Sequence, residues 1–383
     1  MEEKKVPALR FRGFDNAWEH CKLGDVFEQT SNLVTLGNGE VKLWSLTVED
    51  GLTPKTERYN REFLVKKDGK FKEVRPGDIV YNPMNMTLGA VGYNGMTRSV
   101  AVSGYYTTMI ARENYDAYYI NTWLKSSQAI KLYKIYATGS LIEKQRVQFP
   151  TLSIISASFP RDEEQKQIGE YFRNLDHLIS LHQRKLEMLK KVKKSMLEKM
   201  FPKNDAKVPE VRFSDFTDAW EQHKVREVAD RYDNLRIPVA ANLRISGSTP
   251  YYGANGIQDY VDGYTHEGEF VLVAEDGAND LKNYPVKCVK GRIWVNNHAH
   301  VLQSKNEIAD NKFLAFAISQ ADIEALLVGG GRAKLNAETL MEINMLLPKK
   351  QEQVSIGNYF TNLDHLISLH QRKLEKLKNI KKS

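Results

Sequence analysis

The chain has 383 residues, 42% of them hydrophobic and 27% charged, which is typical of a folded protein with more than one core. No stretch approaches the roughly 18 consecutive apolar residues of a membrane span, and the charged N-terminus MEEKK is unlike a secretion signal. The two cysteines, Cys21 and Cys288, are too few and too far apart for a disulfide framework, so we expect a cytoplasmic protein.

The net charge of +7 points to a polyanionic partner, and its distribution qualifies that interpretation. Residues 161–199 hold 10 basic and 7 acidic side chains, and residues 349–383 hold 8 and 3, which gives +3 and +5. The remainder of the chain is therefore near −1. Binding to nucleic acid would depend on local basic patches, with much of the electrostatic affinity supplied by a partner protein.

The first globular segment, Val6–Phe159, reads as short strands separated by turns, followed by a helix. Strands are expected within Pro76–Asn82, Thr87–Gly95 and Val102–Arg112. A helix is expected around Tyr118–Tyr136.

A long amphipathic helix is predicted after Pro160. Asp162 stands at the position of an N-cap, and Gln165, three residues later, would close a capping box. Apolar residues then recur every three or four positions, and no proline interrupts them before Pro202. Roughly 40 residues at 1.5 Å each give about 60 Å of helix. The spacing is that of a coiled-coil seam.

The second variable segment, Val208–Leu347, has a similar texture. Strands are expected within Gly247–Val261, Gly268–Gly277 and Gly291–Leu302, and a helix near Lys312–Leu327.

The chain is an internal duplication. Ile356–Ser383 repeats Ile168–Ser195 at 23 of 28 positions, and the opening Val208–Val228 repeats Val6–Val26 at 10 of 21. The offset is 202 residues at the openings and 188 at the helices, so the intervening part is 14 residues shorter in the second half. A unit of this size is not a solenoid repeat. Each half is a variable globular segment followed by a nearly constant helix.

A seam of this length needs a partner helix, and the nearest candidate is its own copy at 352–382. An antiparallel pair is the simplest arrangement, with the globular segments at opposite ends and a pseudo-two-fold axis between them. His182 and His370 interrupt the seam at equivalent positions, where we expect a polar residue that sets the register. The predicted seam residues are Phe172, Leu175, Ile179, Leu186, Leu189, Phe360, Leu363, Ile367, Leu374 and Leu377.

The loops of both variable segments place amide, hydroxyl, imidazole and guanidinium side chains between glycines. Such groups read base edges through hydrogen bonds, although a role as turn former or strand surface is the alternative for each single residue. The candidate DNA-binding residues are Asn82, Asn85, Thr87, Arg98, Tyr105, Tyr106, Tyr251, Tyr252, Asn255, Gln258, Asn297, His298, Arg332 and Lys334.

No catalytic or metal-binding motif is found in the sequence. The run Asn82–Asn85 is similar to the Asn-Pro-Pro-aromatic loop of adenine methyltransferases, but it lacks the second proline and the aromatic residue. The run Gly329–Arg332 is not followed by the Lys-Ser/Thr of a P-loop. His298 and His300 have no further metal ligands nearby in the sequence. We therefore predict a non-catalytic chain without a metal site.

Together these features resemble the specificity subunit of type I restriction-modification systems, over essentially the whole chain. The resemblance rests on the duplicated helix at Phe172–Met196 and from Phe360, on Gly77–Gly95 and Gly247–Val261, and on the F-x-x-x-W openings Phe14–Trp18 and Phe216–Trp220.

The resemblance implies an α/β (α+β) fold with two target recognition domains, each reading one part of a bipartite, asymmetric DNA target. Two long antiparallel helices would separate these domains. The implied boundaries are 1–160 and 202–348 for the recognition domains and 161–201 and 349–383 for the spacer helices.

The partners implied by the resemblance are double-stranded DNA, two methyltransferase subunits and, in the full complex, restriction subunits, with no membrane. No cofactor would be bound by this chain, and S-adenosylmethionine would belong to the methyltransferase subunits. The first helix continues MLEKMFPKN after Ser195, whereas the second copy ends at Ser383. The sequence therefore has no counterpart of these residues in the second copy. The alternatives are a structural coiled-coil adaptor whose globular domains bind proteins, and an enzyme in one globular half.

Overall fold

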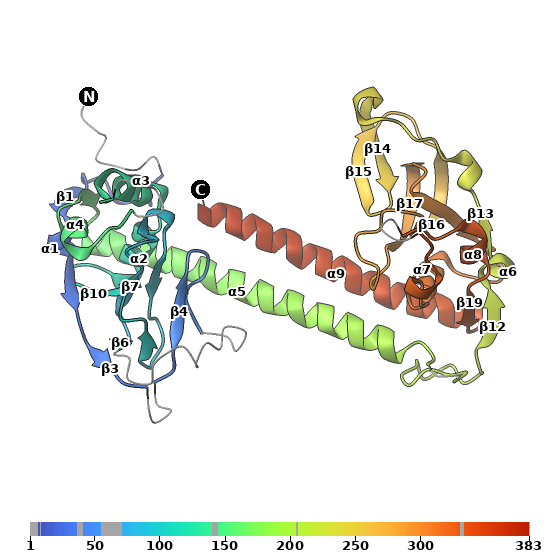
Figure 1. Ribbon diagram of the computed structural model, residues 1–383, viewed down its shortest axis with the longest axis horizontal. Coiled ribbons are helices and arrows are strands. Elements are labelled where there is room, and N and C mark those ends of the chain that lie inside the picture. The colour runs from blue at the N-terminus through green and yellow to red at the C-terminus, as the bar shows by residue number, and fades with distance from the viewer. Residues whose placement is uncertain are drawn as a thin grey trace. The chain divides into compact units, whose positions relative to one another are not determined.

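The structure is a computed structural model that describes residues 7, 9–36, 41–54, 71–139, 145–203, 206–329 and 333–382. The chain forms two compact units (Figure 1). Unit 1 comprises Met1–Ser180 and Leu377–Ser383, and unit 2 comprises Leu181–Lys376. Among the described residues, no helix combines the length and the apolar composition needed to cross a membrane.

Unit 1 is built from short, mostly antiparallel strands. They are β1 (Glu19–Lys22), β2 (Phe27–Thr30), β3 (Leu33–Val34), β4 (Trp44–Thr47), β5 (Gly51–Pro54), β6 (Phe71–Val74), β7 (Ile79–Tyr81), β8 (Val91–Tyr93), β9 (Val100–Val102), β10 (Thr107–Ala111) and β11 (Ser156–Phe159). In the described part of the chain, the main sheet has the order β2-β10-β7-β8 and a smaller one the order β3-β6-β9. β4 pairs with β5, and β1 with β11.

The helices of unit 1 cover the main sheet and complete its core. They are α1 (Leu23–Val26), α2 (Ala117–Leu124), α3 (Ser127–Tyr136) and α4 (Phe149–Ser153), with a 3₁₀ turn η2 (Met86–Leu88). The single helix predicted over Tyr118–Tyr136 is wrong, because Ser126 accepts a hydrogen bond from the Ala129 amide and starts a new helix. Tyr133 and Phe159 are among the fully buried side chains of this core.

Unit 2 has longer strands and one larger sheet. The strands of unit 2 are β12 (Glu221–Lys224), β13 (Ala229–Arg231), β14 (Ser246–Gly253), β15 (Gly256–Val261), β16 (His266–Ala274), β17 (Val286–Val295), β18 (Ala299–Ser304) and β19 (Asn344–Leu347). In the described residues the sheet order is β13-β18-β16-β17-β14-β15, and β12 pairs separately with β19. The β14–β15 hairpin therefore lies at one edge of the sheet, joined to β17 by a short parallel pairing (Figure 1).

The helices of unit 2 include equivalents of those in unit 1. They are α6 (Val225–Val228), α7 (Asn311–Ser319) and α8 (Ala337–Met341), with 3₁₀ turns η4 (Asp233–Leu235), η5 (Ala241–Leu243) and η6 (Glu324–Leu326). The predicted helix at Lys312–Leu327 is shorter than expected, because α7 ends at Ser319 and only η6 follows. Trp220 and Phe313 are fully buried in the core below the sheet.

Two long helices carry the repeated sequence: α5 (Asp162–Lys199, 38 residues) and α9 (Lys350–Lys382, 33 residues). Within unit 2 they lie side by side, with His182 against His370 and Lys193 against Asp364 (Figure 1). Residue numbers rise along α5 as they fall along α9. The helices are therefore antiparallel in this unit, as predicted.

The predicted seam side chains are buried to different degrees. In unit 2, Leu186, Leu189, Phe360, Leu363 and Leu374 are buried and Ile367 is half-buried. In unit 1, Leu175 is buried, and Phe172, Ile179 and Leu377 are half-buried.

The capping box predicted at the start of α5 does not form. The Asp162 carboxylate accepts from Lys166 Nζ at 2.6 Å. The Gln165 side chain instead donates to the Pro160 carbonyl at 2.8 Å and accepts from the Asp116 amide at 3.1 Å. Since Asp116 caps α2, this glutamine joins α2 to the long helix.

Unit 2 repeats this junction with equivalent residues. Gln353 donates to the Pro348 carbonyl at 2.8 Å and accepts from the amide of Asp310, the N-cap of α7, at 3.0 Å. Each cap also lies directly against a glycine of the long helix: Asp116 against Gly169, and Asp310 against Gly357. The duplication therefore extends to the way each globular part is attached.

A bidentate ion pair completes each attachment. Arg10 contacts the two carboxylate oxygens of Glu164 at 2.7 Å each, and Arg212 contacts those of Glu352 at 2.7 and 2.6 Å. The carboxylates of Glu164 and Glu352 are only 2% and 1% exposed. Such fork-shaped pairs fix both distance and angle.

Candidate nucleic-acid interface

The first candidate loop of unit 1 follows β7. Asn82 folds back on its own turn, since its side-chain oxygen accepts from the Met84 amide at 3.0 Å. Asn85 is exposed and precedes η2, whereas Thr87 within η2 is buried. Asn85 is therefore the candidate of this loop whose side chain is exposed to a ligand.

Two neighbouring loops carry the other candidates of unit 1. Tyr105 is 44% exposed, and the guanidinium of Arg146 lies 6.0 Å from its ring centroid. The amide of the next residue, Val147, donates to the Pro83 carbonyl at 3.0 Å, which brings Tyr105 toward the Asn82 loop. Tyr106 is half-buried, and its carbonyl accepts from Lys72. Arg98 is exposed on the separate β8–β9 turn.

In unit 2, the turn between β14 and β15 contacts the loop that follows β16. The exposed Asn255 donates to the Gly277 carbonyl at 2.9 Å and accepts from the Asn279 amide at 2.9 Å. Gln258, also exposed, accepts from the side chain of Asn296 at 3.4 Å. The two amide candidates of the hairpin are thereby tied to two other loops.

The turn between β17 and β18 faces the same loop. Asn296 accepts from the His298 amide at 2.8 Å, and the His298 carbonyl accepts from the Glu275 amide at 2.9 Å. The Nδ1 atom of His298 makes a short contact with a carboxylate oxygen of Asp276. Asn297, between them in the turn, is exposed.

Lys334 reaches this place from a third direction. Its backbone bridges to Asp276, and its Nζ lies 2.9 Å from Glu275 Oε1. Asn255, His298 and Lys334 thus contact residues 275–279 directly, and Gln258 and Asn297 lie beside them at the β17–β18 turn. We call these five candidates the unit 2 loop cluster. It consists of Asn255, Gln258, Asn297, His298 and Lys334.

Two further candidates of unit 2, Tyr251 and Tyr252, lie elsewhere. Tyr251 is buried, its hydroxyl bonds to the backbone of Val239, and Arg244 lies 4.1 Å from its ring centroid. Tyr252 is buried in a small core of the sheet. Both rings therefore support the hairpin from within. Arg332 lies outside the described residues.

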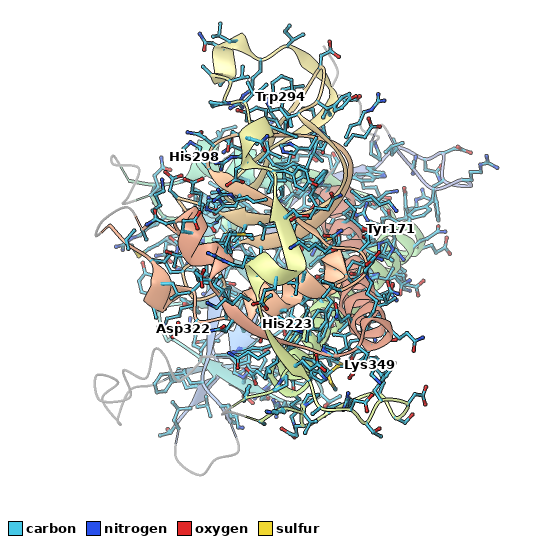
Figure 2. All side chains as sticks on the ribbon, turned by 90° about the vertical axis from the view of Figure 1, so that its right-hand side faces the viewer. Tyr171, His223, Trp294, His298, Asp322 and Lys349 are labelled. Carbon is cyan, nitrogen blue, oxygen red and sulfur yellow. The ribbon has the colours of Figure 1, made fainter. Side chains whose placement is uncertain are left out.

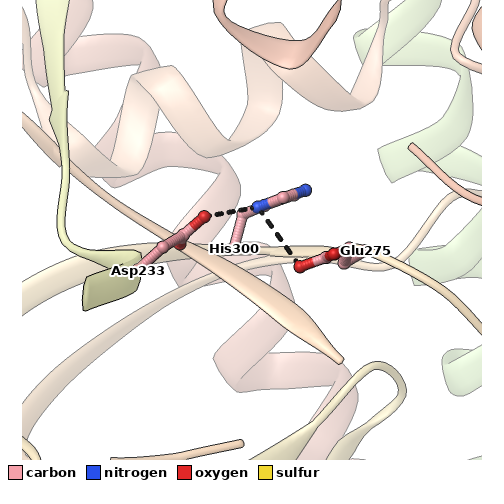
Figure 3. Close-up of side chains that lie close together, drawn as sticks. All are labelled: Asp233, Glu275 and His300. Carbon is pink, nitrogen blue, oxygen red and sulfur yellow. Dashed lines mark hydrogen bonds and ion pairs between the residues drawn. The ribbon is translucent and has the colours of Figure 1, made fainter. Parts of the chain in front are cut away.

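An ion network that was not anticipated from the sequence supports the loop cluster (Figure 3). His300 is 1% exposed; its Nδ1 lies 2.7 Å from Asp233 Oδ2 and 3.7 Å from Glu275 Oε2, and its Nε2 faces the Leu335 carbonyl at 2.9 Å. The three side chains are close enough to suggest a metal site. However, Glu275 is also paired with Arg236 at 2.7 Å and with Lys334.

The charges in this network are balanced within the protein. Burial alone would raise the pKa of Asp233, but hydrogen bonds from His300 and Val301 and the charge of Arg236 outweigh it and lower this pKa. Burial likewise opposes ionisation of Glu275, and hydrogen bonds from Arg236 and Lys334 outweigh it, so its pKa is also lowered. We therefore interpret the network as structural: it fixes the strand ends that carry the loops.

Comparisons with known proteins identify the family. The model of the type I restriction modification DNA specificity domain matches residues 16–191 and again residues 217–379. The chain belongs to this family. Both copies of the specificity domain are present, and together the two matches cover most of the chain, in agreement with the duplication in the sequence.

Similar proteins carry the same description. A putative type I restriction enzyme specificity subunit of Haemophilus influenzae is 45% identical over 142 residues, which span 37% of each chain. A putative MjaX specificity subunit of Methanocaldococcus jannaschii is 22% identical over 95% of this chain and 91% of its own. The crystal structure of a type I restriction-modification S subunit from M. genitalium has the same fold, with a TM-score of 0.70 and 14% identity over 98% of this chain and 96% of that one.

Proposed function

We propose that the chain is the DNA sequence-recognition subunit of a type I restriction-modification complex. The observation that carries this proposal is the presence of two specificity domains, one matched in each half of the chain. The described units repeat the same attachment to α5 and α9, so each half supplies one complete reading module. Two different modules on one chain would read a bipartite, asymmetric target, with half-sites about one DNA turn apart.

The DNA contacts of this proposal are the exposed polar side chains of the candidate loops. In unit 2 they are the members of the loop cluster, and in unit 1 they are Asn85, Arg98 and Tyr105. Amide, imidazole and guanidinium groups on short, well-fixed turns can reach base edges in the major groove. The buried candidates, Thr87, Tyr251 and Tyr252, would act by holding those turns in place.

The modification chemistry of this proposal belongs to partners. Two methyltransferase subunits, which would bind S-adenosylmethionine, and restriction subunits in the full complex would assemble on the chain. Beside the seam, the helices of unit 2 leave Leu181, Met188 and Leu366 between 40% and 49% exposed, which supports docking of apolar partner surfaces there. A cytoplasmic location, where these partners and DNA would be met, belongs to the same proposal.

The domain boundaries of this proposal are those expected from the sequence: recognition domains at 1–160 and 202–348 and spacer helices at 161–201 and 349–383. A coiled-coil adaptor that binds only proteins is not favoured, because both globular parts match a DNA specificity domain.

The proposal is tested by mapping methylated adenines in cells that express methyltransferase subunits with and without this chain. We expect methylation at one two-part motif only when the chain is present. Exchange of Gly24–Thr151 for the corresponding segment of another specificity subunit should change one part of the motif and leave the other intact. Methylation that does not depend on the chain, or an exchange that alters both parts equally, would contradict the proposal.

A further inference from the structure

We infer that His298, held by Asp276, is a specificity-determining residue that accepts a hydrogen bond from the exocyclic amino group of an adenine or a cytosine in the major groove. Asp276 is the positioning residue of this pair. The inference rests on the proposed DNA-binding function and adds the residue, the atom and the class of base that it reads.

The contact between the two side chains fixes the tautomer of the histidine. A carboxylate can only accept, so the Nδ1 atom of His298 that faces Asp276 carries the proton. In the neutral ring, Nε2 is then an acceptor. Among the described residues, no hydrogen bond to Nε2 is found. The His298 side chain is 36% exposed, compared with 19% for Asp276, so the carboxylate lies on the inner side of the pair.

The backbone around the pair is fixed from both sides. Hydrogen bonds at both the amide and the carbonyl of His298 anchor the β17–β18 turn. Asp276 follows Glu275, which is held by Arg236 and Lys334. A side chain that reads a base needs this kind of preorganisation, because a misplaced hydrogen bond loses its discrimination.

The chemistry of a single acceptor defines what it can select. In the major groove, adenine N6 and cytosine N4 present donors, whereas guanine O6 and thymine O4 present acceptors. A fixed Nε2 acceptor would therefore favour adenine or cytosine on one strand and repel guanine or thymine at that position. Exposed amides at Asn297, in the same turn as His298, and at Gln258, on β15, are placed to complete the choice between adenine and cytosine.

The test uses the full chain assembled with its methyltransferase subunits and a library of random DNA duplexes. The wild-type complex should select a two-part motif. With His298→Ala, one base pair in one part should lose about tenfold or more in discrimination, and the other part should be unchanged. Asp276→Asn should reduce the discrimination at the same base pair. A merely structural role of Asp276 would not change the discrimination at that one position.

His223 provides a matched control. It lies on β12, away from the loop cluster, and it also faces a carboxylate, that of Glu227 at 3.4 Å (Figure 2). His223→Ala should select the wild-type motif with unchanged discrimination at every base pair.

A second measurement identifies the atom that is read. The selected duplex is prepared with a purine that lacks the 6-amino group, or a pyrimidine that lacks the 4-amino group, at the affected base. This change should weaken binding by the wild-type complex about tenfold and should not weaken binding by the His298→Ala complex further. If the base analogue weakened binding by the His298→Ala complex as much as binding by the wild-type complex, the inference would be overturned. An unchanged motif for His298→Ala would overturn it too. Failure of the wild-type complex to select any motif would instead contradict the proposed function.

Discussion

His182 and His370 occupy equivalent positions of the duplicated helix, and their Nδ1 atoms lie 2.8 Å apart. A residue that contacts its own repeat copy lies at the centre of the antiparallel pairing of the two repeated sequences. One imidazole donates and the other accepts, so the pair is complete only while at most one of the rings is charged. The two histidines that interrupt the seam therefore face each other across the helix pair, and their role in setting the register stays a prediction.

The burial of His370 beside His182 makes the stability of the protein depend on pH. Burial, followed by the charges of His182, Lys373 and Lys185, lowers the pKa of His370. The unfolded chain protonates this ring near its ordinary pKa of about 6.5, whereas the folded chain does so only at lower pH. The stability that the neutral His370 ring contributes is therefore fully present above about pH 6.5 and is lost as the pH falls through the lowered pKa of the folded state.

We expect the difference in melting temperature between about pH 7.5 and about pH 5.5 to be smaller for His370→Asn than for the wild type. His365→Asn is the matched control, since His365 is exposed on the same helix. Thermal unfolding followed by circular dichroism measures the effect. Equal pH dependence in the wild type and in His370→Asn would show that the pair does not couple to protonation.

Two reciprocal ion pairs should couple the long helices. Lys193 Nζ lies 2.6 Å from Asp364 Oδ1, and the equivalent pair, Lys381 and Asp176, lies at 2.5 Å. Because both are partly exposed, a double-mutant cycle on Lys193→Ala and Asp364→Ala should give a coupling energy of roughly 0.2–1 kcal/mol. Denaturant unfolding of the full chain measures it. Strictly additive losses would mean that the contact contributes nothing to stability.

Loss of a buried attachment should be far more costly. Arg212→Ala leaves the Glu352 carboxylate, 1% exposed, without its bidentate partner and should reduce the free energy of unfolding by about 3–5 kcal/mol. Arg10→Ala should lower the stability in the same direction through the equivalent pair with Glu164. The exposed pair of Lys199 and Glu210 is the control, and Lys199→Ala should have a far smaller effect on stability. Equal losses for the buried and exposed pairs would contradict this account.

A close approach at Gly357 should tolerate no side chain. A Cβ there would lie 2.9 Å from Asp310 Oδ1 and 2.9 Å from the Phe313 amide nitrogen, which is backbone and cannot move aside cheaply. Gly357→Ala should therefore destabilise the protein by roughly 1–3 kcal/mol, although alanine favours helix. Ser368→Ala, at an exposed position of α9, should stay within about 0.5 kcal/mol of the wild type. A stabilised Gly357→Ala variant would show that α7 can shift.

The long elements of the fold could be predicted from the sequence, because they depend on periodicity and on duplication. The seam spacing and the matched histidines gave the two helices and their antiparallel pairing. The shorter elements were harder to predict, since local capping competes with periodicity. Ser126 divides the expected helix at Tyr118–Tyr136, and the side chain of Gln165 bonds to Asp116 instead of closing a capping box.

The sequence indicated which types of residue form the candidate site, but it did not indicate which of them contact one another. Asn255, Gln258, Asn297, His298 and Lys334 come from three separate parts of the chain, and the topology of the sheet brings them to the loop at 275–279 and the neighbouring β17–β18 turn. The sequence drew no attention to Asp276, because its partner lies 22 residues away on another loop. An acidic pair directly after a buried strand was the only local signal.

The repeated attachment has a consequence for inheritance. Each globular part is anchored through one arginine, one glutamine bond and one glycine contact, and these anchors recur while the loops between them differ. Mutations or recombination between related genes could replace the reading surface of one half without disturbing the joint that holds it. Such a chain can acquire a new DNA specificity while its attachment to the long helices stays the same.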